Sequence, residues 1–264
     1  MKETNLCNGS NGFIGSELTR TLKHAGETVI AGDRVGNCPE EVTRIFDLAS
    51  FGNLFHQTDV KEIYKANLYR VLRLLHQSED VYYKSMVLVS SSSVLLPHQT
   101  YYSLSKKAME ELATKWASDH EQPIVIVRPT TVIGVGEQPS HLIPKLIDSC
   151  LNGTEMPFIG DPTHDFLDVR DFVSGMIYVS KRASDLPGYT FNIGSGESIP
   201  NWAIKSLVEE YTGKKANTKE IENMRPYDTR EWKVDTSDIR LLGWSPKYTL
   251  KETIKNMVDK YDQS

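Results

Sequence analysis

The chain has 264 residues and a formal net charge of −5. A chain of this length buries roughly three-quarters of its unfolded surface, so its core needs neither disulfides nor a metal. The acidic balance, without any basic block, argues against nucleic acid and against an anionic membrane as partners. No apolar run reaches the length of a membrane span. The three cysteines, Cys7, Cys38 and Cys150, lack metal-ligand spacing and indicate reduced thiols in the cytoplasm.

A glycine-rich loop follows the first expected strand, Asn5–Asn8. The loop reads Gly9-Ser-Asn-Gly12-Phe-Ile-Gly15, and the helical pattern after it, which includes Phe13 and Ile14, stops at Gly26. Glycines permit a tight turn and let the backbone approach a pyrophosphate, which then sits on the helix N-terminus. The loop therefore predicts a dinucleotide site; an ordinary strand-to-helix turn is the alternative interpretation.

The second expected strand, Thr28–Gly32, leads directly into Asp33. A carboxylate at this place accepts hydrogen bonds from the adenosine ribose hydroxyls and repels a 2′-phosphate, which favours NAD over NADP. Arg34 beside it could stack on adenine or hold a 2′-phosphate, so NADP stays open as the less favoured cofactor.

Two further strands are expected before the next helix. Arg44–Phe46 reads as a third strand ending at Asp47, and Asn53–His56 as a short fourth strand reached by an abbreviated connection. The segment Val60–Gln77 then has the period of a helix. His56 could line a cofactor cleft, but a lone histidine at a strand end is more often a packing or surface residue.

A serine-tipped strand and a Tyr/Lys pair form the most informative stretch. Val87–Val89 is apolar and β-branched, and it runs into four serines. Tyr102 and Lys106 stand four apart at the start of an expected helix, Ser103–His120, and therefore share one helix face. In such a site Lys106 would lower the pKa of Tyr102 from about 10. A second pair, Tyr211 and Lys215, is interpreted as a solvated helix end.

The remaining elements alternate between strands and helices. We expect strands at Ile124–Val127, Phe166–Val169 and Tyr189–Ile193, and helices at His141–Cys150, Arg170–Lys181, from Ser198 or Pro200 to near Gly213, and after the capping box of Thr249 and Glu252. Arg225-Pro-Tyr-Asp228 reads as a turn whose cation could hold a substrate phosphate; a surface ion pair is the equal alternative.

Several motifs in order resemble the extended short-chain dehydrogenase/reductase family, in its nucleotide-sugar epimerase/dehydratase branch. They extend through nearly the whole chain and comprise the glycine loop, Tyr102-Ser-Leu-Ser-Lys106 with Glu110, Arg128-Pro-Thr-Thr-Val-Ile-Gly134, His164-Asp-Phe-Leu-Asp-Val-Arg-Asp171, and Leu242-Gly-Trp-Ser-Pro246. The resemblance implies a Rossmann-type doubly wound parallel sheet with a small discontinuous C-terminal α/β lobe. The NAD-binding domain would take residues 1–130 and about 165–193, and the substrate lobe about 131–164 and 194–264.

The resemblance also implies roles for individual residues. The implied catalytic set is Ser91, which orients the substrate, Tyr102 as general base, and Lys106. The implied cofactor-binding residues are Gly9, Gly12, Phe13, Ile14, Gly15, Asp33, Arg34, Asp47, Leu48, Asn67 and Lys106, with Asp47 on the adenine amino group and Asn67 supporting the catalytic helix. The implied substrate-binding residues are Ser92, Ser93, Thr131, His164, Arg225 and Asp228.

Departures from the family pattern narrow the function. The serines at 91–93 replace the Thr-Asp-Glu set of the dehydratases, so no carboxylate is there to eliminate water. We therefore expect an NAD-dependent nucleotide-sugar epimerase, and by resemblance a homodimer. One alternative is a one-way NAD(P)-dependent reductase or dehydrogenase of a keto sugar or another small carbonyl compound. The other, suggested by shortened loops around the site, is a non-catalytic dinucleotide-binding protein.

Overall fold

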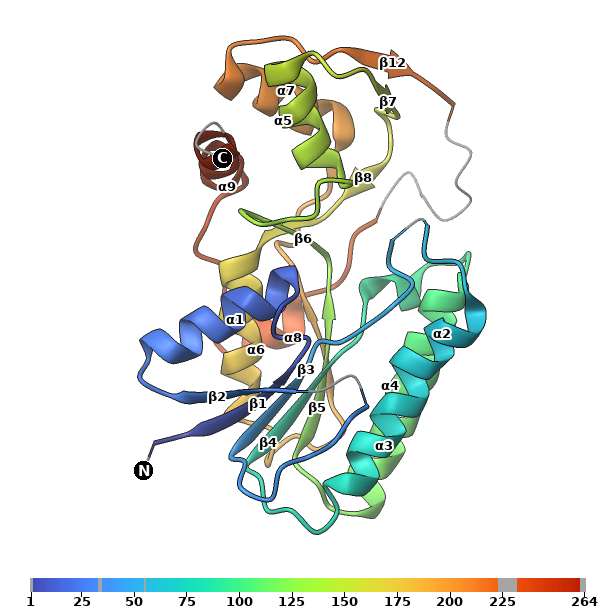
Figure 1. Ribbon diagram of the computed structural model, residues 1–264, viewed down its shortest axis with the longest axis vertical. Helices are drawn as coiled ribbons and strands as arrows, with labels where there is room; N and C mark the ends of the chain where they lie inside the picture. Colours follow the sequence, from blue (N-terminus) through green and yellow to red (C-terminus); the bar gives the residue numbers. More distant parts are fainter. Residues whose placement is uncertain (1, 33–34, 55, 223–231, 262–264) are drawn as a thin grey trace.

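The computed structural model describes residues 2–32, 35–54, 56–222 and 232–261 (Figure 1). A six-stranded sheet forms its centre, and every pair of neighbouring strands in it is parallel. Its spatial order is β10-β5-β4-β3-β1-β2. The bounds are β1 (Thr4–Asn8), β2 (Thr28–Ala31), β3 (Arg44–Asp47), β4 (Ser85–Val89), β5 (Ile124–Pro129) and β10 (Thr190–Ile193).

Helices cover both faces of this sheet, because its central strands are apolar on both sides. On one face α1 (Phe13–His24) and α6 (Val169–Ser180) contribute Leu18, Leu22 and Phe172 to a buried cluster. On the other face α3 (Arg70–Gln77) and α4 (Tyr101–Asp119) contribute Leu74 and Met109 to a second cluster. The predicted Rossmann-type doubly wound sheet is confirmed.

A smaller layer of helices and short strands stands beyond the carboxyl ends of the sheet (Figure 1). Its core draws on two separate stretches of chain, 133–166 and 199–261. It contains α5 (Leu142–Asn152), α7 (Asn201–Thr212) and α9 (Leu250–Tyr261), with β7 (Met156–Phe158) paired to β12 (Thr218–Glu220) and β8 (Thr163–His164) to β11 (Ile199–Pro200). The short α8 (Ser237–Leu241) and Trp244 instead pack on the first cluster of the sheet domain.

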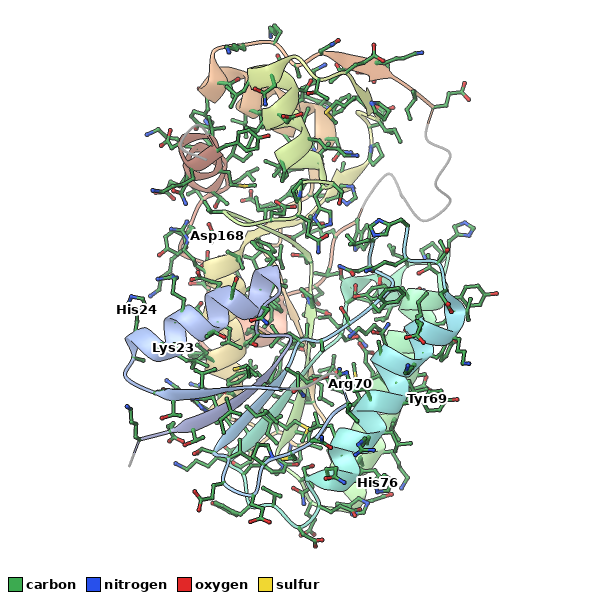
Figure 2. The ribbon with its side chains drawn as sticks, in the orientation of Figure 1. Lys23, His24, Tyr69, Arg70, His76 and Asp168 are labelled. Atoms are coloured by element: carbon green, nitrogen blue, oxygen red, sulfur yellow. The ribbon has the colours of Figure 1, made fainter. Side chains whose placement is uncertain are left out.

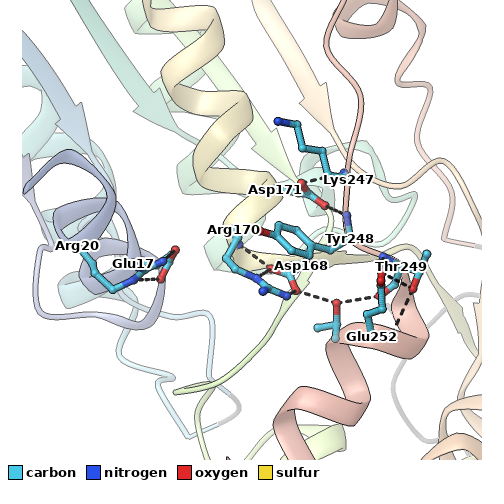
Figure 3. A network of polar contacts seen from close by, with 10 residues as sticks. Glu17, Arg20, Asp168, Arg170, Asp171, Lys247, Tyr248, Thr249 and Glu252 are labelled. Carbon is cyan, nitrogen blue, oxygen red and sulfur yellow. Dashed lines mark hydrogen bonds and ion pairs between the residues drawn. The ribbon is translucent and has the colours of Figure 1, made fainter. Parts of the chain in front are cut away.

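A polar network joins this C-terminal part to α6. The Asp171 carboxylate accepts hydrogen bonds from the backbone amides of Lys247 (3.0 Å) and Tyr248 (2.9 Å), as Figure 3 shows. The hydroxyl of Thr253 on α9 donates to Asp168 (2.7 Å) at the start of the same helix. These contacts connect the segment at 168–171 with the segment at 247–253, which is far from it in the sequence. The expected capping box of Thr249 and Glu252 is present at the start of α9.

The helix expected over Val60–Gln77 is interrupted by one wider turn. It consists of α2 (Val60–Tyr64), a π-helical turn at Lys65–Tyr69 (η1) and α3. Such turns insert an extra residue into a helix and occur frequently at functional sites. The buried residue of this turn is Asn67, whose contacts are described below.

The position of the third strand, β3, in the sheet differs from that in the usual doubly wound fold. In the usual doubly wound arrangement the third strand lies outside the second. Here β3 lies on the opposite side of β1, between β1 and β4, and β2 is the edge strand. The short fourth strand expected over Asn53–His56 is wrong, because residues 53, 54 and 56 belong to no strand. Too few residues connect β3 to α2 for both a crossover and another strand.

The described part of the chain contains neither a membrane-spanning helix nor a candidate metal cluster. No helix there has both the length and the apolar character required to cross a bilayer. That part of the chain also holds no group of three or more histidine, cysteine or acidic side chains placed to bind a metal ion.

Candidate active site

A cavity of about 1430 Å³ opens at the carboxyl ends of β1, β3, β4 and β5. Ligands of open parallel sheets bind at this edge, where the strand order reverses. The cavity is lined by the glycine loop, the connection after β3, the serines after β4, the start of α4, the residues after β5, and Trp232. It thus brings together most of the predicted site residues.

The glycine loop has the close packing that a dinucleotide pyrophosphate requires. A Cβ on Gly15 would lie 2.0 Å from the Gly9 carbonyl oxygen, and Gly9 itself has a φ of 79°. Gly12 is the N-cap of α1 and supplies no side-chain cap, and the first turn has no acidic residue. The first amides of α1 can therefore bind an anion. The chain fits NAD at this end, and all five predicted loop residues line the cavity: Gly9, Gly12, Phe13, Ile14 and Gly15.

The three predicted catalytic residues line the same cavity. Ser91 follows β4 and accepts a hydrogen bond from the Ser93 hydroxyl (2.9 Å). Tyr102 and Lys106 lie on one face of α4, and the Lys106 ammonium donates to the carbonyl of Val89 (2.8 Å). The sequence predicted that the end of the serine-tipped strand and the start of the following helix would meet. In the structure, the end of β4 and the start of α4 both line this cavity.

The electrostatics of these groups differ from the expectation. Burial raises the pKa of Tyr102 to about 12, and hydrogen bonding by Ser91 and Ser50 acts in the opposite direction. Burial also lowers the pKa of Lys106 to about 8, opposed mainly by the charge of Asp47. The expected lowering of the Tyr102 pKa by Lys106 is wrong for this structure, because desolvation of the phenolate is the largest effect.

A pH dependence of stability follows from the buried lysine. Between pH 8 and 10.5 the unfolded chain binds more protons at Lys106 than the folded chain, so the free energy of unfolding rises with pH there. Above pH 10 the raised Tyr102 pKa works in the opposite direction. We expect Lys106→Met to flatten the rise between pH 8 and 10, measured by urea unfolding. The exposed Lys115→Met is the control, and an unchanged rise in Lys106→Met would contradict the assignment.

Asp47 lies outside the cavity lining and is paired within the protein. Its carboxylate accepts two hydrogen bonds from Arg70 (2.6 and 2.8 Å) and one from the Asn8 amide (2.9 Å). Figure 2 shows Arg70 between α3 and the sheet, whereas the exposed Tyr69 points away. The structure therefore places Asp47 outside the cavity, where it does not make the predicted contact with the adenine amino group. Leu48, the next residue, does line the cavity.

Asn67 joins the loop after β3 to the catalytic helix. Its side-chain amide donates to the carbonyl of Phe51 (2.8 Å) and to the hydroxyl of Ser105 on α4 (2.9 Å), and its oxygen accepts from the amide of Phe51 (3.0 Å). Asn67 is fully buried and does not line the cavity. Its place in the structure agrees with a supporting role for α4 and not with direct cofactor contact.

An ion pair joins α4 to the end of β5. Glu110 receives two hydrogen bonds from Arg128 at the end of β5, at 2.8 and 2.6 Å. Both residues belong to motifs in the resemblance. The pair lies one helical turn beyond Lys106, so it fixes α4 against the strand ends that form the cavity floor.

The predicted substrate residues divide into three groups. Ser93 and Thr131 line the cavity. Ser92 is buried and His164 lies on β8; neither lines the cavity, but both contact Trp232, which does. Arg225 and Asp228 lie outside the described residues, as do Asp33 and Arg34 of the predicted cofactor-binding set.

Trp232 was missed from the sequence. Its indole nitrogen donates to the Ser92 hydroxyl (3.2 Å), and its ring lies 5.5 Å from that of His164. It thereby joins the C-terminal part of the chain to the serine segment across the cavity. Ser50, beside Tyr102, was missed as well. A single aromatic or serine in an irregular segment has no local pattern that would have pointed to it.

A carboxylate–imidazole pair at the lobe side of the cavity was also missed. Glu137 is buried, and one of its oxygens lies 3.0 Å from Nδ1 of His141, the N-cap of α5. Burial raises the pKa of the Glu137 carboxyl, opposed by His141. His141 lines the cavity, so the contact with the carboxylate fixes an imidazole at the cavity wall. Their spacing of four residues, in a glycine-rich connection before a helix, was the available signal.

The parallel sheet, the glycine loop at its carboxyl edge, and a tyrosine and a buried lysine facing one cavity define a Rossmann-type dinucleotide-binding enzyme. The family model described as the NAD dependent epimerase/dehydratase family matches residues 40–194, which is more than half of the chain. The protein belongs to this NAD-dependent family, and the resemblance to extended short-chain dehydrogenases/reductases is confirmed.

The sequence identity to individual relatives is low. The low-salt glycan biosynthesis protein Agl12 of Haloferax volcanii is 28% identical over 163 residues, covering 61% of this chain and 52% of that protein. The chain thus spans about half the length of this relative. CDP-abequose synthase of Salmonella typhimurium is 22% identical, with 98% of each chain covered. MoeE5, solved with UDP-glucuronic acid and NAD, has a TM-score of 0.90 at 24% identity, with 99% of each chain covered.

Proposed function

We propose that the protein is an NAD-dependent nucleotide-sugar epimerase. One observation carries this proposal: Ser91, Tyr102 and Lys106 line the same cavity as the glycine loop. A proton-transfer group and a dinucleotide site in one cavity are the two requirements for oxidising a sugar hydroxyl. The lack of carboxylates at the serine positions argues against elimination of water.

In the proposed reaction, NAD supplies the acceptor and then the donor of a hydride. The Ser91 hydroxyl orients the reacting sugar hydroxyl by a hydrogen bond, and Tyr102 takes the hydroxyl proton as the carbonyl forms. Lys106, whose ammonium donates a hydrogen bond to the Val89 carbonyl, lies on the same helix face as Tyr102 and lines the same cavity. Tyr102 returns the proton when the sugar carbon is reduced on its other face.

Nucleotide sugars are the proposed substrate class. The cavity extends past Tyr102 to Thr131, His141 and Trp232, which lie on the side of the C-terminal lobe. An aromatic ring together with hydroxyl and imidazole groups suits a sugar and its phosphates. The bound UDP-glucuronic acid of MoeE5 and the name of the Salmonella relative support the same class.

Proton NMR of the protein with catalytic NAD and a panel of UDP-, dTDP- and CDP-sugars tests the proposal. We expect a new anomeric signal from one sugar, without accumulation of NADH and without signal in the Tyr102→Phe variant. Conversion that persists in Tyr102→Phe would contradict the assigned base. Binding of the sugar without any conversion would favour the non-catalytic alternative.

A second candidate, one-way reduction of a keto sugar, uses the same residues of the same cavity. In that reaction the protonated Tyr102 hydroxyl would donate a proton to the carbonyl oxygen. Consumption of NADH in proportion to an added keto sugar would establish this activity, and an unchanged nicotinamide absorbance during sugar conversion would establish the epimerase.

A further inference from the structure

The hydroxyl of Ser91 has only one hydrogen to donate. Its oxygen already accepts hydrogen bonds from the hydroxyl (2.9 Å) and from the backbone amide (3.2 Å) of Ser93. A serine hydroxyl offers two acceptor positions and a single O–H. Both acceptor positions are occupied here. In the proposed reaction the O–H of Ser91 orients the sugar hydroxyl, and it is then not available to Tyr102.

Tyr102 has a second serine beside it, Ser50. This residue lies on the connection after β3 and lines the cavity together with Tyr102 and Ser91. Burial raises the pKa of Tyr102, and hydrogen bonds from Ser91 and Ser50 act in the opposite direction. A hydrogen bond that favours the ionised form of a tyrosine is one donated to its phenolic oxygen. Tyr102 therefore has a hydroxyl donor that does not belong to the serine segment after β4.

The connection that carries Ser50 is fixed on both sides of this residue. The carbonyl of Ala49, before it, accepts a hydrogen bond from Arg70 (2.9 Å). The amide and carbonyl of Phe51, after it, are both hydrogen-bonded to the side chain of Asn67, at 3.0 and 2.8 Å. Arg70 and Asn67 are themselves buried. The backbone of Ser50 is consequently held between two anchored peptide groups.

The same connection packs directly against Tyr102. Gly52 has a φ of 101°, and a Cβ at this position would lie 2.7 Å from Cγ1 of Ile63 and 3.5 Å from Cβ of Tyr102. Such a backbone conformation and such a close approach require glycine. The amide of Gly52 also donates to the side chain of Gln57 (2.8 Å). The folded chain thus holds Ser50, two residues before Gly52, at the tyrosine.

We propose that Ser50 is a positioning residue of the acid–base site, whose hydroxyl continues to donate to the phenolic oxygen of Tyr102 while Ser91 donates to the sugar. This inference rests on the proposed role of Tyr102 as general base. The hydrogen bond from Ser50 stabilises the phenolate before it takes the proton of the sugar hydroxyl, and it holds the phenol in place afterwards. Ser50 keeps its own proton throughout, so the step needs no further donor or acceptor.

Three variants test the proposal by kinetics. Ser50→Ala should lower kcat by about 10–100-fold, because a hydrogen bond to a charged oxygen is lost, whereas the KM of the sugar and the affinity for NAD should not change. Ser50→Thr keeps the hydroxyl on an exposed side chain and should retain most of the activity. The matched control is Asn53→Ala, since Asn53 is exposed and lines the cavity on the same connection. Wild-type kcat in Ser50→Ala, no recovery in Ser50→Thr, or an equal loss in Asn53→Ala would overturn the proposal.

The ionisation of Tyr102 tests the contact without turnover. Carbon-13 NMR of tyrosine-labelled protein follows the Cζ carbons, and the signal of Tyr102 is the one missing from Tyr102→Phe. Loss of a donor to the phenolate raises the pKa of a tyrosine, so the ionisation of Tyr102 should begin about one pH unit higher in Ser50→Ala than in the wild type. The same onset in both proteins would contradict the contact. A protein that converts no sugar can still show this shift, so failure of this inference and failure of the proposed epimerase are distinguishable.

Discussion

Replacing Tyr102 with phenylalanine is expected to lower kcat by about 10²–10⁴-fold, the usual contribution of a positioned acid–base group. The substitution removes one oxygen from a half-buried ring that lines the cavity beside Ser91. NAD affinity should not change, because the glycine loop and Lys106 remain. Steady-state kinetics on the converted sugar, together with a cofactor titration, measure both quantities.

The matched control is Tyr211→Phe. Tyr211 lies four residues before Lys215, so this pair has the same spacing as Tyr102 and Lys106. It lies at the end of α7 in the lobe, and the exposed Lys215 pairs with Glu209. Full activity is expected there. Equal losses in both tyrosine variants would mean that the assay reports folding and not proton transfer.

Replacing Arg70 with methionine is expected to lower the free energy of unfolding by about 3–5 kcal/mol, because it leaves a buried carboxylate unpaired. Asp47 and Arg70 have side chains that are 3% and 5% exposed. Arg70 also donates to the carbonyl of Ala49 (2.9 Å), so its loss should loosen the connection that follows β3. Urea denaturation measures the effect.

Two companion variants make this expectation specific. The exposed pair Lys115–Asp119 should contribute about 1 kcal/mol or less when Lys115 becomes methionine. The double variant Arg70→Met with Asp47→Leu removes both charges and should recover much of the lost stability. A double variant less stable than Arg70→Met alone would show that the cost comes from packing and not from an unpaired charge.

Local patterns located most elements and most of the cavity. The glycine loop, the serine-tipped β4 and the Tyr102–Lys106 spacing depend on neighbours within a few residues, and all of them line one cavity. Helix and strand bounds mostly agree within two residues, because capping residues such as Thr100 and Thr249 act locally. The four residues at 33, 34, 225 and 228 stay predictions.

Other features depend on contacts between distant segments. Asp47 ends a strand, as expected, but its partner Arg70 is 23 residues away, and their ion pair requires α3 to pack on the sheet. Glu137 and His141 are close in sequence, yet only the folded chain buries Glu137 and places His141 at the cavity. Trp232 reaches Ser92 across 140 residues. Composition and period contain no information about such pairs.

The sequence by itself determined the class of fold, the family and the order of the chemical groups along the chain, because short-range spacing and turn chemistry specify these. Only the tertiary structure decided that β3 lies beside β4 instead of outside β2, since strand pairing depends on which apolar faces the whole sheet can bury. Only the tertiary structure decided that Tyr102 is a weak acid in the folded chain, since its pKa depends on how much water the surrounding segments exclude.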